Sequence, residues 1–178
     1  MKLIRRTNST ARFCIYFFVS ILISIVVYVW LRNSSAIEPF LGFNAQLATD
    51  IWNLFDNSAI VTNTAISSSD FNFEVTAECT SIGPTAIFTS AVIAWPSTIK
   101  EKIKGIIVGA AALFIINLIR ILTLFYIGSH FPNQLDLFHY YIWQGIIVLL
   151  ALGLWVFWMD KMVQSPLPGI SDNQAQAT

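Results

Sequence analysis

One arginine lies inside the longest apolar run of the chain and limits what the sequence can fold into. The run covers residues 105–128, has Arg120 as its only charged residue, and is long enough to cross a bilayer as a helix. An ionised side chain costs on the order of 3 kcal/mol at the centre of a membrane helix, so Arg120 should face a protein interior or a wet cavity instead of lipid. We therefore expect a membrane protein with a functional site at Arg120.

The composition agrees with this class. The 178 residues are 56% hydrophobic and only 11% charged, with a mean hydropathy of +0.66, which is typical of a membrane protein. The formal net charge is zero, so nothing indicates a nucleic-acid partner. The expected surroundings are a lipid bilayer.

The apolar runs predict a mainly α-helical membrane fold, a bundle of four transmembrane helices at about residues 13–31, 80–99, 105–128 and 138–159. The second run is the weakest, because hydroxyl side chains and Pro96 dilute it. The first run exceeds the apolar core of about 7 to 15 residues of a signal peptide, so we expect an uncleaved anchor. Cleavage after the small residues 34–36 is the alternative.

The basic residues predict the orientation. Four of them precede the first run and three lie between the second and third runs, and such segments stay in the cytoplasm. Both termini are then cytoplasmic. We expect residues 1–163 to form a single integral membrane domain that includes an external segment at residues 33–79, followed by a polar, disordered cytoplasmic tail at residues 164–178.

The external segment has a readable pattern. Residues 40–55 carry apolar side chains at helical spacing, which predicts an external interfacial helix on the outer membrane face or, equally, a helix packed against the bundle. Residues 60–66 and 71–78 then predict the two strands of a short β-hairpin with its turn at residues 67–70. This hairpin would deliver Cys79 to the mouth of the second span.

The two cysteines have different settings. Cys14 lies near the inner end of the first span and Cys79 at the outer end of the second, some 25 to 30 Å apart, which excludes a disulfide between them. Inert packing is the usual role of a free cysteine and stays open for both. For Cys79, however, Thr80, Ser81 and Pro84 suit the start of a helix, whose positive end favours a thiolate.

Three further polar residues lie at or near the outer side. His139 opens the fourth span, either with a functional role or as an interfacial anchor beside tyrosines, and His130 reads as an exposed loop residue. Asn117 precedes Arg120 by three residues and shares its helical face, so we expect it to support Arg120 or to hydrogen-bond to a neighbouring helix.

Cys79, Arg120 and His139 fall at comparable outer depths on three successive spans. A thiol nucleophile, a base and a cation are the groups that acyl transfer needs. Because helical side chains lean toward the N-terminus, Arg120 must extend outward, or its span must end near Leu124. The sequence has no HExxH, no CxxC and no glycine-rich phosphate loop, so we expect neither a metal nor another cofactor.

At these residues the chain resembles the exosortase/archaeosortase family of membrane transpeptidases, most closely the short exosortase H type. The resemblance runs over about residues 71–158 and is carried by Cys79, Asn117-x-x-Arg120 and His139-x-x-x-Trp143-Gln144. Several relatives have a glycine two residues after the cysteine. This chain has Ser81 there and a glycine only at Gly83, which leaves the subtype open.

The resemblance implies a membrane-embedded cysteine protease and transpeptidase of the bacterial inner membrane, with its active site on the outer side. Its partners would be exported proteins with a C-terminal motif, a hydrophobic span and a basic tail. Cys79 would be the nucleophile, His139 the base and then the acid, and Arg120 the stabiliser of the thiolate or oxyanion. The alternative is a non-catalytic membrane scaffold or small transporter subunit. An intramembrane protease of the paired-aspartate type is disfavoured, because no predicted span contains an aspartate.

Overall fold

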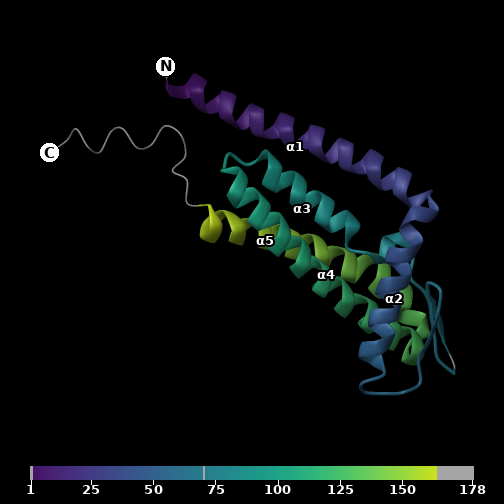
Figure 1. The fold of residues 1–178 in the computed structure, drawn as a ribbon. Coiled ribbons are helices and arrows are strands. Elements are labelled where there is room, and N and C mark those ends of the chain that lie inside the picture. The colour runs from purple at the N-terminus through teal and green to yellow at the C-terminus, as the bar shows by residue number, and fades with distance from the viewer. Residues whose placement is uncertain (1, 70, 164–178) are drawn as a thin grey trace.

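Four helices of the protein lie side by side along one direction, and a fifth turns away at one end beside a small sheet (Figure 1). The computed structural model describes residues 2–69 and 71–163. In chain order the elements are α1 (Lys2–Arg32), η1 (Ser35–Ile37), α2 (Glu38–Trp52), β1 (Ile60–Thr62), β2 (Ala65–Ser67), β3 (Asn72–Glu74), η2 (Ala77–Cys79), α3 (Ile82–Ala94), α4 (Ile99–His130), η3 (Pro132–Gln134), η4 (Leu137–Ile142) and α5 (Trp143–Met162).

The contacts of α3 show how the helices run. Against α1, Phe13 packs edge-on to Trp95 at 5.9 Å between ring centroids, and the Ser20 hydroxyl donates to Ser90 Oγ at 3.2 Å. Higher numbers on one helix meet lower numbers on the other, so α1 and α3 are antiparallel. Trp95 also meets Trp155 of α5 at 5.8 Å.

Glycines let the long helix α4 approach its neighbours closely. A Cβ atom at Gly109 would collide with the ring of Phe88 on α3, and one at Gly105 would collide with the indole of Trp158 on α5. Both aromatic side chains are only 2% exposed and belong to one buried cluster. Close contact across small residues is how helices gain packing energy in a membrane, where apolar surface alone supplies little driving force.

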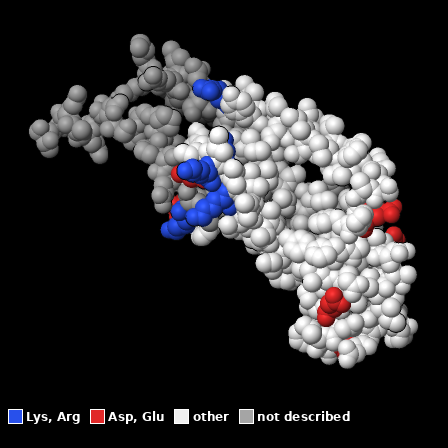
Figure 2. All heavy atoms as spheres, in the orientation of Figure 1, with Lys and Arg blue, Asp and Glu red and all other residues white. Residues whose placement is uncertain are grey.

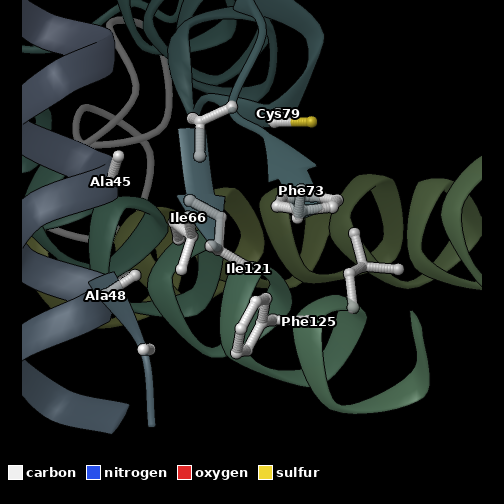
Figure 3. Close-up of a cluster of buried hydrophobic side chains, with 10 residues drawn as sticks. Ala45, Ala48, Ile66, Phe73, Cys79, Ile121 and Phe125 are labelled. Atoms are coloured by element: carbon white, nitrogen blue, oxygen red, sulfur yellow. The ribbon is translucent and has the colours of Figure 1, made fainter. Parts of the chain in front are cut away.

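A second buried cluster joins α2, the sheet, η2 and the C-terminal half of α4 (Figure 3). Trp52 of α2 packs edge-on to Phe125 of α4 at 4.9 Å between ring centroids. Cys79 is one of the cluster's buried members, which are Ala45, Ala48, Ala59, Ile66, Phe73, Val75, Cys79, Ile121, Leu124 and Phe125. The element that carries Cys79 is therefore fixed by packing as well as by hydrogen bonds.

The mainly helical membrane class is confirmed, with one difference in the spans. Within residues 2–69 and 71–163, three helices are long and apolar enough to cross a bilayer: Ala11–Arg32, Ile99–His130 and Pro132–Lys161. The second predicted span, at residues 80–99, is instead the 13-residue helix α3, which rises only about 20 Å against a hydrocarbon core of about 30 Å. It is shorter mainly because Trp95, the residue before Pro96, is extended, and residues 95–98 are non-helical before α4 begins at Ile99.

The external segment also differs from the prediction. The sheet has three antiparallel strands in the order β1-β2-β3, where a two-stranded hairpin was expected. The run at residues 60–66 is broken by a two-residue turn in which Asn63 adopts φ 55°, a left-handed conformation that asparagine tolerates. Strand β3 stops at Glu74, and residues 77–79 form a 3-10 turn where the prediction continued the strand to residue 78.

The predicted external helix is present as α2, and it packs against the bundle. Phe43 of α2 stacks on Phe114 of α4 at 6.1 Å, and the pairing of Trp52 with Phe125 continues the contact along the same two helices. These contacts favour the packing alternative over a helix lying free on the membrane surface. The predicted tail at residues 164–178 lies outside the described residues.

Charged side chains lie mainly at the two ends of the bundle in the view of Figure 2. Basic side chains gather at the end that carries the turn from α3 to α4, where Lys100, Lys102 and Lys104 lie, and acidic side chains also appear at the opposite end. The first turn of α4 is fixed by a capping box between Thr98 and Glu101. This distribution agrees with the lysines marking one membrane boundary.

The glycine contacts predict a position-specific effect on stability. Gly109→Ala should lower the free energy of unfolding by about 1 to 3 kcal/mol, because the added methyl group displaces the Phe88 ring inside a packed cluster. Gly153→Ala on α5 is the matched control, since its Cβ would meet no atom within 4 Å. Unfolding in mixed detergent micelles measures both variants, and an equal loss in the two would contradict the packing argument.

Candidate active site

Cys79 closes a single 3-10 turn between the sheet and α3. The turn is held by the Cys79 amide, which donates to the Thr76 carbonyl at 3.0 Å, and by the Thr80 amide, which donates to the Ala77 carbonyl at 3.2 Å. The Thr76 hydroxyl reaches Cys79 Sγ at 3.6 Å. Cys79 is 2% exposed, so its sulfur is withdrawn from the surface and held on a short, fixed element.

His139 approaches this sulfur from the other side. Its Nε2 lies 3.5 Å from Cys79 Sγ, a distance at which either the thiol donates to a neutral imidazole or an imidazolium donates to a thiolate. The residue lies in the π-helical segment η4, immediately before α5, and π-helical turns are frequent at functional sites. The ring is half-buried and packs against Tyr140.

Arg120 and Asn117 hold the turn from the side of α4. Asn117 Nδ2 donates to the Cys79 carbonyl at 2.8 Å, and Arg120 Nη1 donates to the preceding carbonyl, that of Glu78, at 3.3 Å. The two side chains are 0% and 3% exposed. Two residues one helical turn apart therefore bind two consecutive carbonyls, and this fixes the backbone at the nucleophile candidate.

Arg120 is a buried cation without a carboxylate partner among the residues that the structure describes. Its Nε, like Asn117 Oδ1, has no hydrogen-bond partner there. A buried unpaired charge is costly, because desolvation is not offset by an opposite charge. A thiolate at Cys79, or an oxyanion formed beside it, would supply the missing countercharge.

Glu78 links the site to α1. Its carboxylate pairs with Arg32 at 2.8 Å, while its carbonyl receives the bond from Arg120. Hydrogen bonding by its own backbone amide lowers the pKa of the Glu78 carboxyl below its usual value; burial opposes this shift, and the Thr76 hydroxyl and Arg32 add to it. The residue before Cys79 is thus a carboxylate tied to the last residue of the first span.

The structure brings Cys79, His139, Arg120 and Asn117 together and leaves two other residues apart. His130 is exposed at the end of α4, where its ring stacks on Tyr126 at 4.4 Å. Cys14 is a free cysteine exposed on α1, so it does not pack inside the bundle of described helices. The helix that carries Arg120 does not end near Leu124; it continues to His130.

Arg32 and Glu78 were not recognised from the sequence. A signal was present, because Arg32 and Arg120 are the only Lys or Arg residues outside the segments predicted to be cytoplasmic. Both of these arginines bind Glu78, the residue beside Cys79. The π-helical form of residues 137–142 had no such signal.

The depth of the site follows from α4. Asn117 lies thirteen residues after Lys104, the last of the three lysines, or about 20 Å along the helix axis, which is in the far half of a hydrocarbon core of about 30 Å that begins at that lysine. The remaining turns of α4 extend roughly 15 Å beyond Arg120 and carry α2 and the sheet. The thiol is therefore recessed under a cap formed by α2 and the sheet.

The fold and the buried Cys79–His139 pair define a multi-pass helical membrane protein with the groups needed for thiol chemistry. The model of the transmembrane exosortase family matches residues 5–159, which is most of the chain. The chain belongs to the transmembrane exosortase family. Among curated proteins and among solved structures, no similar protein was found.

The buried and exposed contacts at the turn should differ in strength. Asn117→Leu should lower the free energy of unfolding by about 1 to 3 kcal/mol, because it leaves the buried Cys79 carbonyl without its donor. Arg32→Gln should cost less than about 1 kcal/mol, since its ion pair with Glu78 is about half exposed. Unfolding in detergent compares the two. If Arg32→Gln is the more damaging change, the turn depends on α1 and not on α4.

Proposed function

We propose that the protein is a cysteine protease and transpeptidase embedded in the bacterial inner membrane. It cleaves the C-terminal sorting signal of exported proteins, which comprises a short motif, a hydrophobic span and a basic tail, and it transfers the new acyl group to an acceptor. Family membership supports the class. The single observation that carries the proposal is the partly buried contact of 3.5 Å between Cys79 Sγ and His139 Nε2 beside the Arg120 guanidinium, which has no carboxylate partner among the described residues.

The reaction follows from the positions of these groups. His139 Nε2 accepts the thiol proton of Cys79, and the thiolate attacks the carbonyl carbon of the scissile peptide bond. The carbonyl π electrons move to the oxygen, and the Arg120 charge stabilises the resulting oxyanion. When the tetrahedral intermediate collapses, the C–N bond breaks and His139 returns the proton to the leaving amine. A Cys79 thioester remains.

The second half of the reaction releases the enzyme. The acceptor, either water or an amine, loses a proton to His139 as it attacks the thioester carbonyl, and the C–S bond then breaks. Cys79 takes the proton back from the imidazolium. A positioned base of this kind contributes about 10²- to 10⁴-fold to the rate. Asn117 acts through Cys79, because its bond to the Cys79 carbonyl fixes the turn that carries the sulfur.

The proposed orientation places the site on the outer face. The lysines at the start of α4 belong on the cytoplasmic side by the positive-inside rule, and the site lies toward the other end of that helix. Exported proteins held by a C-terminal span would present the residues just outside that span at this depth. The external segment around α2 and the sheet would cover the reaction.

Replacing the nucleophile tests the function. In cells whose only copy is Cys79→Ala, the exported substrates should keep their C-terminal span, because no thioester forms and the peptide bond stays intact. Mass spectrometry of the membrane fraction detects the retained C-terminal peptides, and immunoblotting detects the larger size. Cys14→Ala is the matched control, since that exposed thiol lies far from His139, and it should process substrates normally.

An unchanged set of C-terminal peptides in the Cys79→Ala cells would remove the nucleophile role. The protein would then be a scaffold or a transporter subunit, in which Arg120 and Asn117 serve as structural residues.

Arg120→Lys separates charge from geometry. Lysine keeps the positive charge but loses the planar fork with which arginine binds the Glu78 carbonyl and still leaves Nε free. We expect processing to fall at least about tenfold, since one well-placed oxyanion donor is worth roughly 10²- to 10³-fold in rate. The precursor-to-product ratio on an immunoblot measures the loss. Full processing by Arg120→Lys would mean that any cation at this position suffices.

A further inference from the structure

A groove of about 480 Å³ opens between α1, α3 and α4. Phe40 of α2 also lines the groove. Its lining is apolar or hydroxyl-bearing throughout, with no charged side chain, and includes Ser24, Ser81, Thr85, Thr89, Ala110 and Phe114. Its position along α4 places it within the hydrocarbon depth, so an occupant must be suited to a membrane interior.

The hydroxyl groups of this groove differ from those elsewhere on the helices. Ser90, Thr123 and Ser129 each donate to the backbone carbonyl one turn earlier, at 2.7 to 2.9 Å. The four groove hydroxyls make no hydrogen bond within the part of the chain that the structure describes; they belong to Ser24, Ser81, Thr85 and Thr89. A hydroxyl without a partner is costly in hydrocarbon, so these four groups call for a polar group on whatever fills the groove.

Ser81 is the most informative of the four. It is only 5% exposed and precedes the first residue of α3, yet its side chain does not cap the helix. A hydroxyl that neither caps its own helix nor bonds elsewhere among the described residues, and that lines a groove, is positioned for an external partner.

The groove has the dimensions and spacing of a helix contact. Ser81, Thr85 and Thr89 recur every fourth residue and so share one face of α3. They cover about 12 Å, or roughly two helical turns. Small side chains, including Ala86 and Ala110, leave room for a backbone to approach. Within hydrocarbon only a helix satisfies its own backbone groups, so a helix is the expected occupant.

We propose that this groove is the docking site for the hydrophobic span of the substrate, and that it selects spans with small residues at four-residue spacing on one face. The inference rests on the proposed function and adds to it where the span binds and what it must contain. Small residues on that face would bring the backbone carbonyls of the span within reach of the four hydroxyls.

Continuity with Cys79 favours the substrate over a second copy of the chain. The outer end of the groove is at Ser81, two residues from Cys79. About two or three residues of extended polypeptide cover the distance between these positions. A span docked in the groove would therefore present its preceding residues to the thiol, whereas a second copy docked there would obstruct the site.

Site-specific photocrosslinking tests the docking. Benzoylphenylalanine is placed at Thr85 in the full-length Cys79→Ala protein, and the probe is the precursor that accumulates in Cys79→Ala cells. The matched control has the same photoreactive group at Ile115, which is 58% exposed on α4 and does not line the groove. Thr85 should crosslink to the C-terminal span of the precursor, and Ile115 should not.

The outcomes separate the two proposals. If the precursor accumulates but crosslinks from Ile115 as strongly as from Thr85, or from neither, the docking site is wrong while the function stands. Crosslinks from Thr85 only to a second copy of the chain, or only to lipid, also overturn it. If no precursor accumulates in Cys79→Ala cells, the proposed function fails and the docking site fails with it.

Filling the groove gives a second readout. Ala86→Phe should reduce processing roughly tenfold or more, because a ring in a close helix contact forces the docked span away. Ile115→Phe should leave processing unchanged. Both variants are made in the Cys14→Ala background, so that alkylation by a small maleimide reports only on Cys79. An unchanged alkylation rate in Ala86→Phe shows an intact site, and normal processing by that variant would overturn the docking site.

Discussion

Two side chains from one turn of α4 hold the backbone on which the candidate nucleophile sits. Arg120 binds the carbonyl of Glu78 and Asn117 binds the carbonyl of Cys79. Both are almost fully buried at a depth where an unpaired polar group is expensive, so the turn and α4 stabilise each other. Arg120 Nε and Asn117 Oδ1 still have no hydrogen-bond partner among the described residues. Free polar atoms of this kind are what a site needs if it is to bind a substrate or a thiolate.

The rest of the fold brings the third group to this turn. Tight packing of α4 against α3 and α5, across Gly109 and Gly105, fixes the relative positions of the three helices. That same register places Trp95 against Trp155 near the lysine-bearing end and, sixteen residues earlier in each segment of the chain, Cys79 of η2 against His139 of η4. A shift of one helix by a single turn, about 5.4 Å, would separate the sulfur from the imidazole. The small sheet and α2 then cover the turn from outside.

The shared depth of the site residues along the helices could be predicted from the sequence. The individual hydrogen bonds and ion pairs between them could not. Apolar runs, lysine positions and helical spacing placed Cys79, Arg120, Asn117 and His139 near one level, and the structure brings these four together. Hydropathy does not reveal which carbonyl an arginine binds, so the role of Glu78 was missed. The second span was predicted too long, because Pro96 was taken to dilute the apolar run and in fact ends the helix at the residue before Trp95. The turn at Asn63 was missed because Asn-Thr is a weaker hairpin signal than Asn-Gly.

The central claim is that His139 activates Cys79 for attack on a carbonyl, and the alkylation rate of that thiol tests it most directly. In the Cys14→Ala background, iodoacetamide should modify Cys79 at neutral pH at least about tenfold faster than it modifies the same thiol in His139→Ala, because removal of the base withdraws the proton acceptor 3.5 Å from the sulfur. Equal rates in the two proteins would contradict the account, since the imidazole would then be a neighbour of the thiol and not its base.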